Sequence, residues 1–102
     1  MLDVKFALFD LDGKELNYEG YERMENNKKT FVYPLQGEPQ LLFTNVKFPP
    51  YKGDGVSVGF IGLVLEGKIV RKSRFENVYK LRDGDILKTS YRLSLGFQKE
   101  LA

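Results

Sequence analysis

The sequence predicts an all-β fold, in which residues 1–102 form one antiparallel β-sandwich or partly closed barrel of the jelly-roll or immunoglobulin-like type. Along most of the chain, apolar residues alternate with polar ones at the period of two that strands require. Turn signals rich in Gly, Asp, Asn and Pro divide the chain into seven or eight short strands. No apolar stripe at helical spacing persists for three turns, so we expect at most one helical turn.

The first quarter of the chain predicts one strand and one hairpin. Residues 3–9 alternate apolar and polar side chains and end at an Asp-Leu-Asp-Gly turn, residues 10–13. Residues 20–25 and 29–34 are expected to pair as a hairpin around the two asparagines at 26–27.

The middle of the chain contains the longest apolar run. Residues 40–48 predict a strand that the Pro-Pro pair at 49–50 stops, because proline cannot donate to a sheet ladder. Residues 56–65 are apolar or small, with β-branched residues and two glycines, which indicates a central strand buried on both faces. A turn at 66–67 leads into residues 68–72, whose alternating basic side chains are typical of a protected edge strand.

The last expected strand covers residues 86–97 and follows a tight turn at residues 82–85. Alternation within it predicts one face that carries Ile86, Lys88 and Ser90. The opposite face carries Leu87, Thr89, Tyr91, Leu93, Leu95 and Phe97.

The composition excludes several kinds of functional site. The chain has no Cys, His or Trp, which excludes disulfides, thiolate or imidazole zinc sites, haem ligation, and catalysis by Cys or His. We therefore predict a protein that is not an enzyme and holds no cofactor or metal. No apolar run approaches the ~20 residues that span a bilayer, and the first residues lack a secretory leader pattern, so we expect synthesis in the cytoplasm and no membrane association.

Charge is distributed unevenly along the chain. The net charge is only +2, but residues 1–25 carry seven acids against three bases, whereas residues 66–102 carry nine bases against five acids. Such asymmetry can place opposite charges on two sides of one fold, pattern contacts between copies, or belong to an ordinary solvated surface. The small net surplus does not by itself indicate nucleic-acid binding.

The segment before Gly13 resembles the first motif of haloacid dehalogenase-like phosphatases, an apolar strand followed by Asp-x-Asp-Gly. The resemblance implies a nucleophilic Asp10, an acid/base Asp12 and a bound magnesium ion. However, Lys14 stands where that family has Thr, and the chain lacks the crossover helices of a parallel α/β domain. A hairpin turn is therefore the favoured interpretation of this segment. The carboxylates of Asp10, Asp12 and Glu15 could also bind calcium, but a solvated turn is favoured over this alternative as well.

The densest basic region contains two aromatic residues, Phe75 and Tyr79, among the cations Lys68, Arg71, Lys72, Arg74, Lys80 and Arg82. A structural edge strand is the favoured interpretation. The alternative is a ligand-binding module for a glycan or single-stranded nucleic acid, in which Tyr51, Phe75 and Tyr79 form a stacking platform.

An ordered set of short elements resembles a family of small all-β proteins encoded in tailed-bacteriophage structural gene clusters. The resemblance spans residues 6–97. Its elements are the segments 20–23, 46–49, 58–63, 66–67, 77–81, 84–87 and 93–97, which would form successive strands and turns.

The resemblance implies a non-enzymatic virion component, such as a capsid decoration, fibre-attachment or tail protein. Its partners would be other virion proteins and further copies of itself, with charge-complementary head-to-tail or ring contacts between copies. Its location would be the virion. The expected contact residues, which the sequence pattern places at the surface, are Tyr51, Lys52, Asp54, Arg71, Lys72 and Arg74.

Overall fold

The computed structural model describes residues 3–25, 29–32 and 40–94, and these residues form six strands and no helix. All paired strands are antiparallel, which confirms the predicted all-β class. The prediction of seven or eight strands is wrong for the described residues. The strands are β1 (Val4–Asp10), β2 (Lys29–Val32), β3 (Gln40–Lys47), β4 (Val56–Leu65), β5 (Lys68–Leu81) and β6 (Lys88–Ser94).

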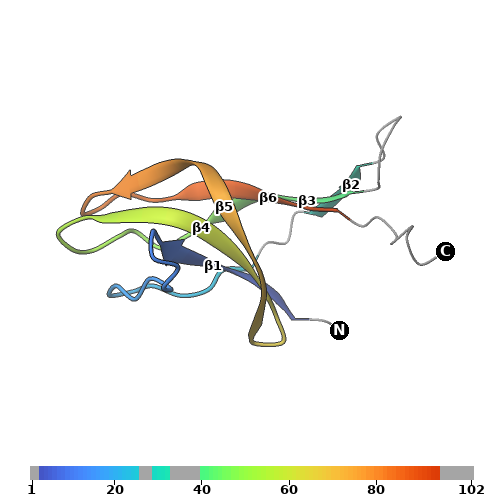
Figure 1. Cartoon of the computed structure of the whole chain (residues 1–102), viewed down its shortest axis with the longest axis horizontal. Helices are drawn as coiled ribbons and strands as arrows, with labels where there is room; N and C mark the ends of the chain where they lie inside the picture. The colour runs from blue at the N-terminus through green and yellow to red at the C-terminus, as the bar shows by residue number, and fades with distance from the viewer. Residues whose placement is uncertain (1–2, 26–28, 33–39, 95–102) are drawn as a thin grey trace.

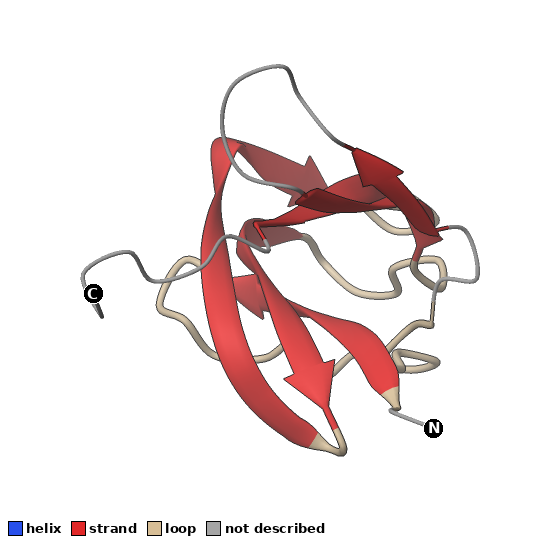
Figure 2. Ribbon diagram, turned by 90° about the vertical axis from the view of Figure 1, so that its right-hand side faces the viewer, coloured by secondary structure: helices blue, strands red, loops and turns tan. Residues whose placement is uncertain are grey.

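The six strands form two three-stranded sheets, with the strand orders β1-β4-β5 and β2-β3-β6 (Figure 1). Figure 2 shows the sheets as two layers of the same molecule. This arrangement is compatible with a β-sandwich. The central position of β4, between β1 and β5, confirms the prediction that its long apolar run is buried on both faces.

The expected hairpin of residues 20–25 and 29–34 is wrong. Residues 20–25 form no strand and contribute a single bridge, between Met24 and Phe6 of β1. β2 pairs with β3 instead. A physical reason is the positive φ of Gly20 and the turn in which the Tyr21 amide bonds the Tyr18 carbonyl, because both bend the backbone where a strand would have to start. The proposed turn at 26–27 lies outside the described residues.

Two other strand boundaries differ from those predicted by more than one residue. β5 continues to Leu81 instead of stopping at residue 72. β6 starts at Lys88 instead of residue 86, since its register with β3 ends at the pair Lys47–Lys88. Before it, the Leu87 carbonyl accepts a hydrogen bond from the Phe48 amide, beyond the end of β3. The predicted faces of this last strand are confirmed within the described part, since Leu87 and Tyr91 are buried whereas residues 86, 88 and 90 are exposed. Residues 95–97 lie outside the described residues.

The facing sides of the two sheets share one apolar core. The Phe6 ring of β1 contacts Phe43 of β3 and Tyr91 of β6, with ring centroids 5.0 and 5.3 Å apart. All three side chains are buried. Because an aromatic side chain buries on the order of 150–250 Å², these contacts contribute much of the attraction that holds the sheets together.

A smaller apolar cluster lies on the opposite face of the β1-β4-β5 sheet. Ala7, Phe9 and Val64 are buried there, and Phe60 packs against them. Gly62 lies opposite Ala7 in the strand register, and a Cβ atom added to Gly62 would lie 2.5 Å from the Phe9 ring. The ring fills the space that a side chain at residue 62 would need, which explains a glycine inside a buried strand.

Candidate interaction surface

β5 lies at the edge of its sheet and has β4 as its one strand neighbour among the described residues. Its register against β4 is interrupted twice, since Val70 and residues 75–78 have no partner on β4. Between these interruptions, residues 71–74 pair regularly with residues 60–63. An edge strand presents unpaired backbone N–H and C=O groups, which can pair with an added strand.

Two cations of β5 lie over aromatic rings of the small outer cluster. The Lys72 ammonium is 4.5 Å from the centroid of the Phe9 ring and donates a 2.8 Å hydrogen bond to the Gly13 carbonyl. The Arg74 guanidinium lies 5.1 Å from the centroid of the Phe60 ring. Each position is favourable because the face of an aromatic ring attracts a cation and because the aliphatic stems cover apolar surface.

Arg71 belongs to the other face of the sheet. Its register partner is Leu63, which is buried in the main core, whereas Lys72 is paired with Gly62 of the outer face. Arg71 is itself exposed. The three predicted cationic contact residues therefore lie on one strand but not on one face.

β5 also exposes apolar side chains. Ile69 and Tyr79 are each 39% exposed, Val78 is 47% exposed and Val70 is 53% exposed. The Phe75 ring contacts the Tyr79 ring edge to face, with centroids 4.8 Å apart. Exposed apolar groups beside charged ones are typical of surfaces that bind other macromolecules.

The loop before β4 contains the other predicted contact residues. Lys52 and Asp54 are exposed, as expected. Tyr51 is buried, which contradicts its predicted exposure. Its ring contacts Tyr18, its hydroxyl accepts a hydrogen bond from the Gly55 amide, and it belongs to the main core. Tyr51 therefore holds the loop against the fold instead of presenting a side chain to a partner.

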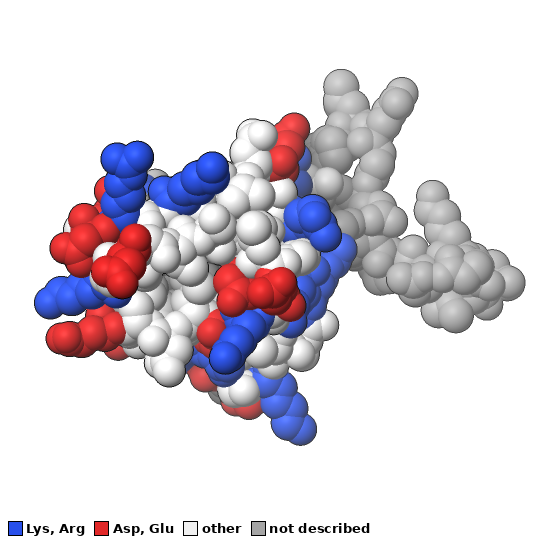
Figure 3. Space-filling model, turned by 60° about the vertical axis from the view of Figure 1, so that its left-hand side comes forward, with Lys and Arg blue, Asp and Glu red and all other residues white. Residues whose placement is uncertain are grey.

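The predicted stacking platform is only partly assembled. Phe75 and Tyr79 are in contact, but Tyr51 is buried and its ring packs against Tyr18. On the face shown in Figure 3, acidic and basic side chains are interspersed around an uncharged central area. This face does not gather one sign of charge in the way that phosphate binding requires.

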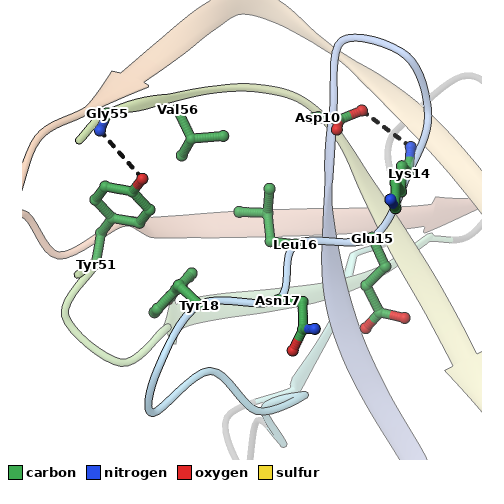
Figure 4. Close-up of a pocket in the computed structure, with 9 residues that line it drawn as sticks. All are labelled: Asp10, Lys14, Glu15, Leu16, Asn17, Tyr18, Tyr51, Gly55 and Val56. Atoms are coloured by element: carbon green, nitrogen blue, oxygen red, sulfur yellow. Dashed lines mark hydrogen bonds between the residues drawn. The ribbon is translucent and has the colours of Figure 1, made fainter. Parts of the chain in front are cut away.

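An open cavity of about 410 Å³ lies where residues 14–18 pass the start of β4. Figure 4 shows Tyr51, Val56 and Leu16 on its wall, with the Asp10 carboxylate near Lys14 at the other end. The Asp10 Oδ1 atom accepts hydrogen bonds from the amides of Asp12 and Lys14, at 2.9 and 3.0 Å. This carboxylate therefore shapes the turn, as the hairpin interpretation predicted.

A polar network beside β1 was not anticipated. The Glu15 carboxylate forms a salt bridge with Arg23 at 2.8 Å and accepts a 2.8 Å hydrogen bond from the Tyr21 hydroxyl. The same hydroxyl accepts a hydrogen bond from the amide of Leu8 in β1. The hydrogen bonds from Arg23 are the main cause that lowers the pKa of Glu15, and burial is the main cause that raises the pKa of Tyr21.

The network accompanies the irregular backbone of residues 21–23, which belong to the strand predicted at residues 20–25. Nothing in the sequence indicated Glu15 as the partner of Tyr21 and Arg23, because Glu15 lies outside the predicted hairpin and bridges Phe9 of β1. Among the described residues, no group of three or more acidic side chains converges in a way that could hold a metal ion.

Comparisons with known proteins find no match to this chain among family models, curated proteins or solved structures. Within the described part, no helix is long and apolar enough to cross a membrane.

Proposed function

We propose that this chain is a non-enzymatic structural protein that acts through protein–protein contacts, as a decoration, fibre-attachment or tail component of a bacteriophage particle. The resemblance of the short sequence elements between residues 6 and 97 supports a place in a virion. The two facing sheets support a β-sandwich of the jelly-roll or immunoglobulin-like type.

The observation that carries this proposal is the edge strand β5. It is 14 residues long, and all but three of its residues are exposed. Its exposed side chains combine cations with apolar groups. Among the described strands only β4 pairs with it, so its outer edge offers backbone groups to a partner strand. A small protein with such a strand is suited to contact neighbours in an assembly, where many weak interfaces add up.

The roles of the carboxylates also support a non-enzymatic protein. Asp10 closes a turn, Glu15 is paired with Arg23, and Asp85 accepts a 2.7 Å hydrogen bond from the Arg82 amide. Carboxylates held in this way are poorly placed to act as nucleophile or general acid.

Mass spectrometry of particles purified from a strain that encodes the chain tests the proposed function. The expected result is that the chain is present at a constant ratio to the major structural proteins. Its absence from purified particles would contradict the virion proposal.

A phosphatase assay tests the non-enzymatic part of the proposal. We expect no magnesium-dependent hydrolysis of p-nitrophenyl phosphate above the level of an Asp10→Asn variant. Turnover that this substitution abolishes would establish a catalytic Asp10 and overturn the proposal.

A ligand-binding module for glycan or single-stranded nucleic acid is the second candidate, and the contact of Phe75 with Tyr79 beside the cations of β5 favours it. It predicts tyrosine fluorescence quenching by short oligosaccharides, or salt-dependent binding of single-stranded oligonucleotides, with loss of binding in Tyr79→Ala. No quenching and no oligonucleotide binding would exclude this second candidate function.

A further inference from the structure

The two edges of the β1-β4-β5 sheet carry opposite charge. One edge is β5. Beyond the other edge, the segment after β1 folds back and pairs with it at two bridges, Phe9 with Glu15 and Phe6 with Met24. The glutamates of residues 19–25 and the cations of residues 71–74 therefore lie on opposite sides of one sheet. The acidic turn at residues 10–13 does not share this placement, because Lys72 of β5 bonds its Gly13 carbonyl.

The basic edge, defined as residues 71–74 of β5, is regular and exposed. These residues keep an unbroken register with residues 60–63. The Arg71 and Arg74 side chains are exposed. Lys72 is turned over Phe9 and bonded to Gly13, and Arg74 lies over the Phe60 ring on the same face. Arg71 lies on the other face, so Arg71 and Arg74 present one exposed guanidinium on each face of this edge.

The acidic edge, defined as residues 19–25, exposes carboxylates on its outer side. Met24 exchanges both of its backbone hydrogen bonds with Phe6, at 2.8 and 3.0 Å. In an antiparallel pair, the residues before and after a hydrogen-bonded residue direct their N–H and C=O groups away from the paired strand. Glu25 follows Met24, so its backbone N–H and C=O groups point outward, toward a partner. The charge of Arg23 is balanced by Glu15. Three exposed glutamates, Glu19, Glu22 and Glu25, then outnumber the remaining cation Lys5 of β1, which lines a surface hollow together with Glu22 and Glu25.

We propose that copies of this chain associate head to tail, with the basic edge of one copy against the acidic edge of the next. This inference rests on the proposed function in protein–protein contacts and names the partner as a second copy. Because the two edges lie on opposite sides of one sheet, the contact is heterologous and generates a ring or an open filament. A two-fold contact of β5 with itself is disfavoured, since it would place like charges opposite each other.

Sedimentation velocity of the full chain at low and at moderate salt tests the proposal, because exposed charge pairs are screened as the Debye length falls from about 30 Å at 10 mM to about 8 Å at 150 mM. We expect species larger than the monomer at low salt and dissociation as salt is raised. Two charge-reversed variants, R71E/R74E and E22K/E25K, should each weaken association at least about tenfold. A monomer at every concentration and salt would overturn the proposal.

Mixing the two variants gives the sharpest result. R71E/R74E has two acidic edges and E22K/E25K has two basic edges, so an equimolar mixture should associate although neither variant does alone. The control K47E/K88E makes the same change in net charge as R71E/R74E, on exposed lysines of β3 and β6 in the other sheet, and should associate like the wild type. Loss of association in the control, or no rescue on mixing, would contradict the proposal.

Failure of this inference is distinguishable from failure of the proposed function. A chain that is present in purified particles but stays monomeric in solution would keep the proposed function and exclude association between copies. A chain that associates as described but is absent from particles would keep the head-to-tail contact and exclude the virion role.

Discussion

The ammonium of Lys72 lies over the Phe9 ring and donates a hydrogen bond to the Gly13 carbonyl, so one side chain ties β5 to the turn after β1 across the outer face of the sheet. We predict that Lys72→Ala lowers the free energy of unfolding by about 1 kcal/mol, because it removes a cation–π contact, a hydrogen bond and the cover over a buried ring. Urea denaturation measures this change.

Two further substitutions separate the contributions of Lys72. Lys72→Met keeps most of the aliphatic cover and should recover part of the loss. Lys68→Ala removes an exposed cation of the same strand and should stay within about 0.5 kcal/mol of the wild type. Equal losses for Lys72→Ala and Lys68→Ala would show that the position over Phe9 contributes nothing.

Gly62 and Phe9 are predicted to be energetically coupled. A methyl group at residue 62 would overlap the Phe9 ring, so Gly62→Ala should destabilise the fold by about 1–3 kcal/mol. In a Phe9→Leu background, Gly62→Ala should lower the free energy of unfolding by less, because the ring that the methyl group would overlap is absent. Additive losses in the double variant, measured by thermal or urea unfolding, would contradict the coupling.

The Glu15 carboxylate is predicted to make stability depend on pH in the acid range. The pKa of Glu15 is lower in the folded chain than in the unfolded chain, where a glutamate has a pKa of about 4.3. The carboxylate therefore contributes fully to the free energy of unfolding above that pH, and this contribution is lost as pH falls through the folded pKa. Glu15→Gln should therefore lower stability at neutral pH and flatten the decline in acid. Glu19→Gln, at an exposed glutamate, is the control; identical pH profiles for wild type and Glu15→Gln would refute the prediction.

Two buried tyrosines should respond in opposite ways to loss of the hydroxyl. The Tyr91 hydroxyl is buried and has no hydrogen-bond partner among the described residues, so Tyr91→Phe should leave stability unchanged or raise it by up to about 1 kcal/mol. The Tyr51 hydroxyl accepts from the Gly55 amide, so Tyr51→Phe should cost about 1 kcal/mol. A clear loss in Tyr91→Phe would show that its hydroxyl is hydrogen-bonded in solution.

The class of the fold was predictable because alternation and turn residues act locally. The run from residue 56 to residue 65 indicated a doubly buried strand, and β4 is that strand. Strand pairing was less predictable, because it depends on contacts between distant residues. Residues 20–25 have strand-like alternation, but the hydrogen bonds of Tyr21 and Arg23 to Glu15 accompany an irregular backbone there.

The surface was predicted less well than the interior. Arg71, Lys72 and Arg74 are exposed on an edge strand, as the basic alternation indicated. The sequence could not show that Lys72 crosses over Phe9 or that Tyr51 is buried against Tyr18. Both contacts join segments that are far apart in the chain, and an aromatic residue in a Gly-rich loop has the same local pattern whether it faces solvent or core.

Hydrogen exchange of the β5 amides tests the central claim, that this edge strand is a contact surface, most directly. Exchange is compared between dilute and concentrated protein at low salt, with β4 amides as the internal reference. The account predicts slower exchange in residues 71–74 of concentrated protein, because amides on the free edge gain partners, and no change in β4. Equal exchange of β5 at both concentrations, while the protein associates, would contradict it.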